Sequence, residues 1–303
     1  MNRFRLFLVA LFFCLPLAAN AAVSSGDFPD GTMWYMHADL KEMRSTDAGR
    51  DLYVWLDDEV FSEVKEEIGI DLKNEVDRVT AFSNTFRGSV IVVESNISDE
   101  SRDKLLALAQ LGGSLELLTH KKKAYYHIGN GRSENGDNGI DSLEESAYFT
   151  FAIKGKLIVA TGEDQLKSLM DRNGKIAGAG KRDGSLFVLT ADKNFVQAGM
   201  RTKGLGDIDW DSNILRHIEQ AALLIADRDG MIAIEAKLVS TDPGMAEAVA
   251  SIINGLISLQ AFNTDIEPEI ARIIENTKVG VVDNVLSIST VVDPEVVVNI
   301  LVD

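Results

Sequence analysis

Two short segments alternate hydrophobic residues with small or polar ones and end in the same Ala-Asp pair. The first runs from Met33 to Asp39 and the second from Leu186 to Asp192. Alternation with a period of two residues predicts a β-strand, and each segment continues into residues with helical spacing. The recurrence of strand, Ala-Asp pair and helix predicts that the chain contains two copies of one module.

Each predicted copy continues with a hairpin, a helix, a second hairpin and a closing helix. In the first copy these are strands 76–83 and 89–95, helix 100–111, strands 148–153 and 157–161, and a helix beginning near 163. In the second copy they are strands 219–226 and 231–239, helix 245–262, strands 278–282 and 286–291, and a helix beginning near 293. Asp229-Gly230 is a strong signal for a tight hairpin turn, and Ser98 and Pro243 are typical of helix starts.

The two copies differ in their additional elements. The first has extra strands at 115–119 and 123–128, and the second has an extra helix at 268–276. Glycines and charges gather around the join between the copies, where the periodicity lapses. The predicted parts are a signal peptide at 1–21, a first α+β module at 22–172, a linker at 173–184 and a second α+β module at 185–303.

The predicted hairpins indicate the fold class. Strands joined by short turns pair antiparallel. The alternation of Ile232, Ile234, Ala236 and Leu238 with more polar neighbours predicts one buried sheet face, which helices would cover. The expected fold is therefore α+β, with two related modules whose antiparallel sheets are covered by helices.

This order of elements resembles uncharacterised exported bacterial proteins built from duplicated α+β modules. The resemblance rests on the Ala-Asp strand ends, the hairpins, the amphipathic helices and the Asp283-Asn284 turn. It implies a bacterial host and a periplasmic location. It implies no agreed activity and supplies no site residues.

The N-terminal segment has the three parts of a secretory signal. Arg3 and Arg5 precede an apolar run from 6 to 15, and Ala19 and Ala21 stand at the positions that a signal peptidase recognises. The run is about half of the ~20 apolar residues that a membrane-spanning helix needs. The sequence therefore predicts cleavage and a soluble mature chain in the periplasm or outside the cell.

Composition excludes several classes of site. The single cysteine, Cys14, lies in the predicted signal, so the mature chain is expected to lack disulfides, thiol catalysis and thiolate metal sites. The chain has 47 acidic and 30 basic residues and a formal net charge of −17. An acidic surface repels nucleic acid, so nucleic-acid binding is not expected.

The first predicted strand carries the clearest candidate for acid–base chemistry. His37 alternates with Tyr35 and Asp39, which places the three side chains on one face. However, Asp39 and Asp192 both stand where a strand meets a helix, and histidine does not recur in the second copy. Both aspartates are therefore interpreted as helix N-caps or turn residues.

The remaining histidines are His120, His127 and His217, and they form no His-Glu-x-x-His motif. His120 and His127 flank a predicted turn and could approach each other. A zinc site would still need further ligands. They are interpreted as surface or edge residues.

Two polar loops have spacings related to those of calcium loops. In the first, oxygen-bearing side chains occupy alternate positions: Asp207, Asp209, Asp211 and Asn213. A calcium loop needs glycine at the sixth position and glutamate at the twelfth, where this chain has Ser212 and Ile218. The second loop, 129–146, would use Glu134 and Glu145 but has Gly136 at the third position. For both loops a calcium site and a plain connecting loop stay open.

Helix 245–262 is apolar on many sides and is predicted to be buried. It would lie either between the modules or along a pocket for a lipid-like ligand or partner helix. No phosphate loop, nucleophile elbow or Ser-His-Asp set occurs. The sequence therefore predicts an exported soluble binding or interaction protein without catalytic or cofactor-binding residues, whose partner is an envelope protein or a small apolar ligand. The alternatives are a periplasmic hydrolase and a calcium-dependent structural or adhesive protein.

Overall fold

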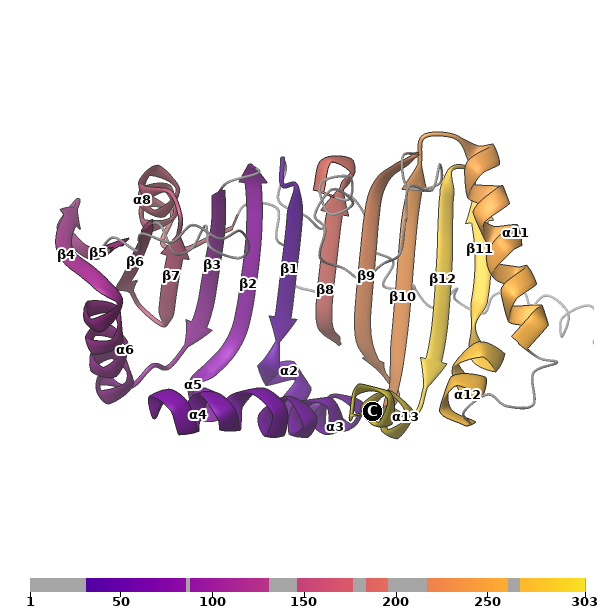
Figure 1. The fold of residues 1–303 in the computed structure, drawn as a ribbon, viewed down its shortest axis with the longest axis horizontal. Coiled ribbons are helices and arrows are strands. Elements are labelled where there is room, and N and C mark those ends of the chain that lie inside the picture. The colour runs from indigo at the N-terminus through magenta and orange to yellow at the C-terminus, as the bar shows by residue number, and fades with distance from the viewer. Residues whose placement is uncertain are drawn as a thin grey trace, which may run out of the picture.

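The computed structural model describes residues 31–85, 88–130, 146–176, 184–195, 217–260 and 268–302. Its centre is one 12-stranded sheet in which all neighbouring strands are antiparallel (Figure 1). The strands are β1 Trp34–Asp39, β2 Val76–Thr85, β3 Gly88–Ser95, β4 Gly113–His120, β5 Lys123–Asn130, β6 Ser146–Ile153, β7 Lys156–Ala160, β8 Ser185–Asp192, β9 Ile218–Arg228, β10 Met231–Ser240, β11 Lys278–Val282 and β12 Val285–Val292.

The helices lie along one end of the central strands and at the two ends of the sheet (Figure 1). They are α2 Leu40–Ser45, α3 Asp47–Leu56, the π-helix η2 Asp57–Phe61, α4 Ser62–Ile68, α5 Leu72–Glu75, α6 Asp99–Gly112, α8 Glu163–Asp171, α11 Pro243–Gln260, α12 Pro268–Asn276 and α13 Pro294–Val302. Helices α6 and α8 contact β4–β7, while α11 and α12 contact β10–β12. This is a mixed helix and strand architecture dominated by a large antiparallel sheet.

The two halves share one sheet, whereas the sequence predicted a sheet in each module. The sheet is continuous because β1 pairs with β8, with Trp34 opposite Ala191 and Ala38 opposite Phe187. An unpaired first strand would leave a row of backbone groups exposed at the edge of each module, and the pairing removes both edges. Outward from this seam the order is β1-β2-β3-β7-β6 in one half and β8-β9-β10-β12-β11 in the other.

The core also crosses the seam. One cluster joins Leu166, Leu169 and Met170 of α8 to Tyr35 of the first half and Leu224 of the second. A second cluster joins α2 and α3 to strands of both halves, including β8, β10 and β12. Each half thus buries hydrophobic side chains of the other, and the halves are expected to unfold together.

Local signals in the sequence are confirmed at several turns and helix starts. Asp229 and Gly230 form the β9–β10 turn with positive φ angles of 55° and 80°. The Ser98 hydroxyl accepts a hydrogen bond from the Ser101 N–H and caps α6. Pro243 begins α11, where its missing N–H costs nothing. The predicted signal peptide, with Ala19 and Ala21, lies outside the described residues, as does most of the predicted linker.

The position of α11 corrects one prediction. This helix does not lie between the two halves but packs at the far end of the sheet, against β10, β11 and β12 (Figure 1). Ala246 and Ala250 are buried against the sheet, while other apolar residues of the helix are exposed. Within the described residues, no helix has both the length and the apolar character needed to cross a membrane.

Candidate functional site

The acid–base candidates on β1 share one face, as predicted, but their polar atoms are engaged in structural contacts. The His37 Nδ1 atom lies 2.8 Å from the Thr80 hydroxyl. Asp39 accepts hydrogen bonds from the Glu42 N–H at 2.9 Å and from Arg78 Nε at 2.7 Å. The prediction that Asp39 is a helix N-cap is confirmed, because its carboxylate caps α2.

Asp192, at the end of β8, has the same role. Its carboxylate accepts a hydrogen bond from the Phe195 N–H at 2.9 Å. The prediction that this aspartate caps the following helical turn is also confirmed. In both halves the aspartate thus stabilises the start of a helix and is not free to act as a base.

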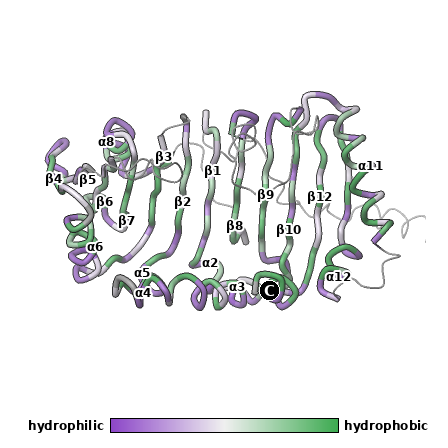
Figure 2. Tube along the Cα trace, viewed as in Figure 1, coloured by the Kyte–Doolittle hydropathy of each residue, from purple (hydrophilic) through white to green (hydrophobic). Residues whose placement is uncertain are grey.

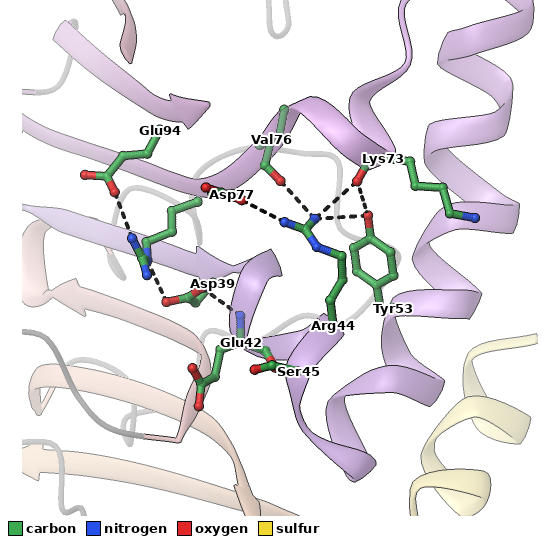
Figure 3. A network of polar contacts seen from close by, with 10 residues as sticks. Asp39, Glu42, Arg44, Ser45, Tyr53, Lys73, Val76, Asp77 and Glu94 are labelled. Atoms are coloured by element: carbon green, nitrogen blue, oxygen red, sulfur yellow. Dashed lines mark hydrogen bonds and ion pairs between the residues drawn. The ribbon is translucent and has the colours of Figure 1, made fainter. Parts of the chain in front are cut away.

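A row of alternating charges crosses four neighbouring strands beside His37. Asp39, Arg78, Glu94 and Lys156 stand opposite one another on β1, β2, β3 and β7. Arg78 bridges Asp39 at 2.7 Å and Glu94 at 3.1 Å (Figure 3). Lys156 contacts Glu94 at 2.8 Å. We call this set the charge ladder. Opposite charges placed directly across strands stabilise a sheet.

The ladder is electrically balanced. Burial alone would raise the pKa of Glu94, but hydrogen bonds from Lys156 and Arg78 outweigh burial and lower that pKa below its usual value. The hydrogen bond to Asp39 raises the pKa of Arg78. Both shifts favour the charged forms of Glu94 and Arg78, so the ion pairs of the ladder hold the neighbouring strands together.

The second half lacks a ladder at the corresponding register. The four positions that match it outward from the seam are Asp192, Gln220, Val239 and Val285. Only the capping aspartate is retained, and the two outer positions are apolar. The ladder is therefore a feature of the first half alone.

A second polar cluster, centred on Arg44 of α2, anchors the helices to β2. Its guanidinium donates to Asp77 at 2.8 Å, to the Val76 carbonyl at 3.0 Å and to the Lys73 carbonyl at 3.2 Å (Figure 3). The Tyr53 hydroxyl donates to the Lys73 carbonyl at 2.6 Å. This cluster joins residues far apart in the chain, and no spacing in the sequence indicates it.

His37 makes the stability of the fold sensitive to acid. Burial lowers the pKa of His37 below its usual value of 6.5, an effect that Asp39 partly opposes. His37 therefore binds a proton more readily in the unfolded chain than in the folded one. The stability that neutral His37 contributes is lost as the pH falls through about 6.5. We expect His37→Gln to show a shallower loss of stability between about pH 7 and pH 5 than the parent chain.

The measurement is urea unfolding at several pH values. His217→Gln is the matched control, because the His217 ring makes a solvent-exposed hydrogen bond of 3.2 Å to the Thr241 hydroxyl. The control is expected to keep the slope of the parent chain. If the free energy of unfolding of His37→Gln changed with pH as steeply as that of the parent chain, burial of this ring would not govern the acid response.

The other predicted site residues do not form a metal centre in the described part of the chain. His120 contacts Asp171 at 3.0 Å, whereas His127 contacts the Ser146 hydroxyl at 2.8 Å. No group of three or more His, Cys, Asp or Glu side chains among the described residues could hold a metal ion. The calcium candidates Asp207, Asp209, Asp211 and Asn213 lie outside the described residues, as does most of the loop 129–146.

One open pocket of about 280 Å³ lies where β3, α6 and the β6–β7 turn meet. Its lining includes Phe151 and Ile153 on the apolar side and Arg102 and Lys156 on the polar side. Both cations already have carboxylate partners, since Arg102 pairs with Asp99 and Lys156 with Glu94. The pocket therefore has no uncompensated charge to attract an ionic ligand.

The outer face of α11 carries an exposed apolar ridge. Ile252, Leu256 and Leu259 are 52%, 55% and 67% exposed. They stand at helical positions i, i+4 and i+7, so they form one stripe, and we call them the α11 ridge. Hydrophobic stretches recur along this helix in Figure 2. The sequence indicated an apolar helix but not that this face would be uncovered.

The space beneath α11 is almost completely filled. The cavity between the helix and the sheet is about 10 Å³ and is lined mainly by apolar residues, including Leu238, Val249 and Leu286. A space of this size holds about one water molecule at most. The helix therefore does not enclose a lipid-like ligand, and its apolar character is divided between a packed inner face and the exposed ridge.

No family model matches the chain, and no curated protein matches it. Among solved structures, crystal forms III and IV of TP0453 match with a TM-score of 0.48 at 10% and 9% identity. Crystal form I matches with a TM-score of 0.39 at 10% identity. Each comparison covers 93% of this chain and 97% or 98% of TP0453.

Proposed function

We propose that the chain is an exported binding protein whose α11 ridge docks into an apolar groove on a protein partner in the bacterial periplasm. The observation that carries this proposal is the exposure of Ile252, Leu256 and Leu259 on a single helical stripe. Contiguous exposed apolar residues are typical of interaction sites. A helix that presents anchors at i, i+4 and i+7 matches the helix-in-groove mode of recognition.

The character of the helix favours a protein groove as the occupant. Glu247 is the only charged residue in α11, and it stands near the N-terminal end, away from the ridge. A convex, uncharged stripe is complementary to a concave apolar surface. A small apolar ligand is disfavoured, because a ligand of that kind needs a cavity and the space beneath α11 is about 10 Å³.

Export and duplication belong to the same proposal. The signal-like segment at 1–21 supports cleavage and release into the periplasm. The first five strands outward from β1 and from β8 follow the same order, which supports the origin of the two halves as two copies of one module. The equivalent caps made by Asp39 and Asp192 support it further.

The test is a pair of aspartate substitutions on the ridge, Leu256→Asp with Leu259→Asp. A charge placed in an apolar groove loses its hydration, and substitution at central anchors weakens protein complexes by about 30-fold or more. We expect the double variant to lose a partner that the parent chain retains from envelope extracts. Its thermal midpoint is expected to stay close to that of the parent chain, because both side chains are exposed.

Ser251→Asp with Ser258→Asp is the matched control. Both serines are exposed and lie on the same helix, so the control adds the same charge without altering the ridge. The control is expected to retain the same partner, whose affinity for each variant is then measured with purified protein. Equal affinities for the ridge variant and the control would contradict the proposal. Turnover of a hydrolase substrate that His37→Ala abolishes would favour an enzyme instead.

A further inference from the structure

The turn between β4 and β5 is made of lysines in an unfavourable backbone conformation. His120 pairs with Lys123, so Lys121 and Lys122 are the two central residues of the turn. Both have positive φ angles, 48° and 69°. Tight hairpin turns of this kind favour Asn-Gly or Asp-Gly, because a Cβ atom is strained at positive φ.

The same chain uses the favoured residues elsewhere. The β9–β10 turn has positive φ angles at Asp229 and Gly230, where the residue types suit the conformation. Geometry alone therefore does not require lysine at the β4–β5 turn. Residues held in sparsely populated backbone regions against their preference tend to mark functional sites.

Contacts within the fold account for part of this basic sequence. Lys121 pairs with Asp171 at 2.8 Å, and Lys123 donates to the Met170 carbonyl at 3.0 Å and to the Asn173 side chain at 2.9 Å. These contacts place cations at the C-terminal end of α8, which the helix dipole favours. They give a structural reason for Lys123 and a weaker one for Lys121, which is 68% exposed.

Lys122 has no such structural reason. Its side chain is exposed, and it makes no hydrogen bond or ion pair to the described part of the chain. Arg172 and Lys175 are also exposed and lie just after α8, whose last residue, Asp171, contacts the turn. The Arg172 guanidinium donates to the Ser168 carbonyl and hydroxyl. We call Lys121, Lys122, Lys123, Arg172 and Lys175 the basic corner. The five residues of the basic corner carry positive charge, and Asp171 supplies the negative charge among their neighbours. Positive charge is therefore in excess at this corner, although the net charge of the whole chain is −17.

Charge complementarity indicates what the basic corner attracts. Clusters of basic residues are attracted to the surfaces of anionic bilayers. A free phosphate ion would instead need a concave cradle of backbone N–H groups. The side chains of the corner are spread over an exposed turn and an exposed loop.

We propose that the basic corner attaches the protein to a bilayer surface that displays anionic phosphate head groups. Lys121 and Lys122 supply the charge at the tip, and the rest of the acidic chain is repelled from the same surface. The corner would therefore orient the molecule with the β4–β5 turn toward the lipid. This attachment is independent of the α11 ridge, which lies at the opposite end of the sheet (Figure 1).

The test replaces the strained turn with favoured residues, in the double variant Lys121→Asn with Lys122→Gly. Binding is measured by co-sedimentation of the chain without the predicted signal peptide (residues 22–303) with phosphatidylcholine vesicles that contain phosphatidylglycerol. Each lysine near an anionic surface contributes a several-fold factor, so we expect about 10- to 30-fold weaker binding. The thermal midpoint should rise or stay unchanged, since Asn-Gly suits the turn. Loss of binding with retained stability cannot be explained by a purely structural role of the lysines.

Lys41→Asn with Lys278→Asn is the matched control, because both lysines are exposed and lie outside the basic corner. The control is expected to bind vesicles within about twofold of the parent chain, since remote surface charges are screened. Vesicles of phosphatidylcholine alone should bind neither protein. Unchanged binding of the turn variant would overturn the proposal. Complete displacement by inorganic pyrophosphate at matched ionic strength would also overturn it, because a discrete phosphate site would then explain the binding.

Discussion

Replacing Leu186 by alanine is expected to destabilise the whole chain by about 3 to 4 kcal/mol. Leu186 belongs to β8, in the second half, and its side chain is fully buried. It packs in one cluster with Leu40, Met43 and Leu52, which belong to α2 and α3 of the first half. The substitution therefore leaves a cavity at the place where the two halves share a core.

The measurement is differential scanning calorimetry. We expect one cooperative transition in the parent chain and one transition at lower temperature in the variant, since a shared core couples the halves. Leu189→Ala is the matched control on the same strand. Leu189 is 37% exposed, so its truncation should cost less than about 1 kcal/mol. If calorimetry showed two separate transitions and Leu186→Ala lowered the temperature of only one of them, the halves would unfold independently.

The local elements were predictable because short-range physics determines them. Strand β11 and helix α12 have the predicted bounds, and Asp229-Gly230 forms the expected turn. The caps made by Ser98 and Asp39 lie where the sequence placed them. Each of these features depends on a few neighbouring residues, whose preferences do not need the rest of the fold.

Contacts between distant strands were not predictable in the same way. The charge ladder depends on the registers of three strand pairs at once, and a slip of one residue would move a side chain to the other face. The pairing of β1 with β8 was not predictable either, because nothing in the strand from Met33 to Asp39 specifies its second neighbouring strand. Single-sequence patterns therefore indicated individual strands but not the pairing of β1 with β8 that joins them into one sheet.

The exposure of α11 was missed for a different reason. Its residues are apolar around most of the helix, which favours burial on every side. The structure covers only the face with Ala246 and Ala250, since α11 lies at the end of the sheet. The sequence therefore indicated a hydrophobic helix, while its place in the fold decides which apolar face is left for a partner.

The charge ladder leads to the second large expected effect, a loss of about 2 to 4 kcal/mol of stability in Arg78→Met. The Asp39 side chain is 7% exposed, and the guanidinium of Arg78 is its partner at 2.7 Å. Methionine retains much of the apolar volume of arginine but leaves the buried carboxylate without a cation. Removing one member of a buried ion pair costs more than the pair contributes, because the remaining charge stays desolvated.

Two further variants separate this explanation from a general loss of packing. Arg102→Met removes an arginine that also has two carboxylate partners, but its side chain is 42% exposed. Its expected cost is about 0.5 kcal/mol or less, as for other exposed pairs. Adding Asp39→Asn to Arg78→Met should recover part of the stability, because asparagine still caps α2 and needs no cation. If urea unfolding shows no recovery in the double variant, the cost of Arg78→Met arises from lost packing and not from the unpaired charge of Asp39.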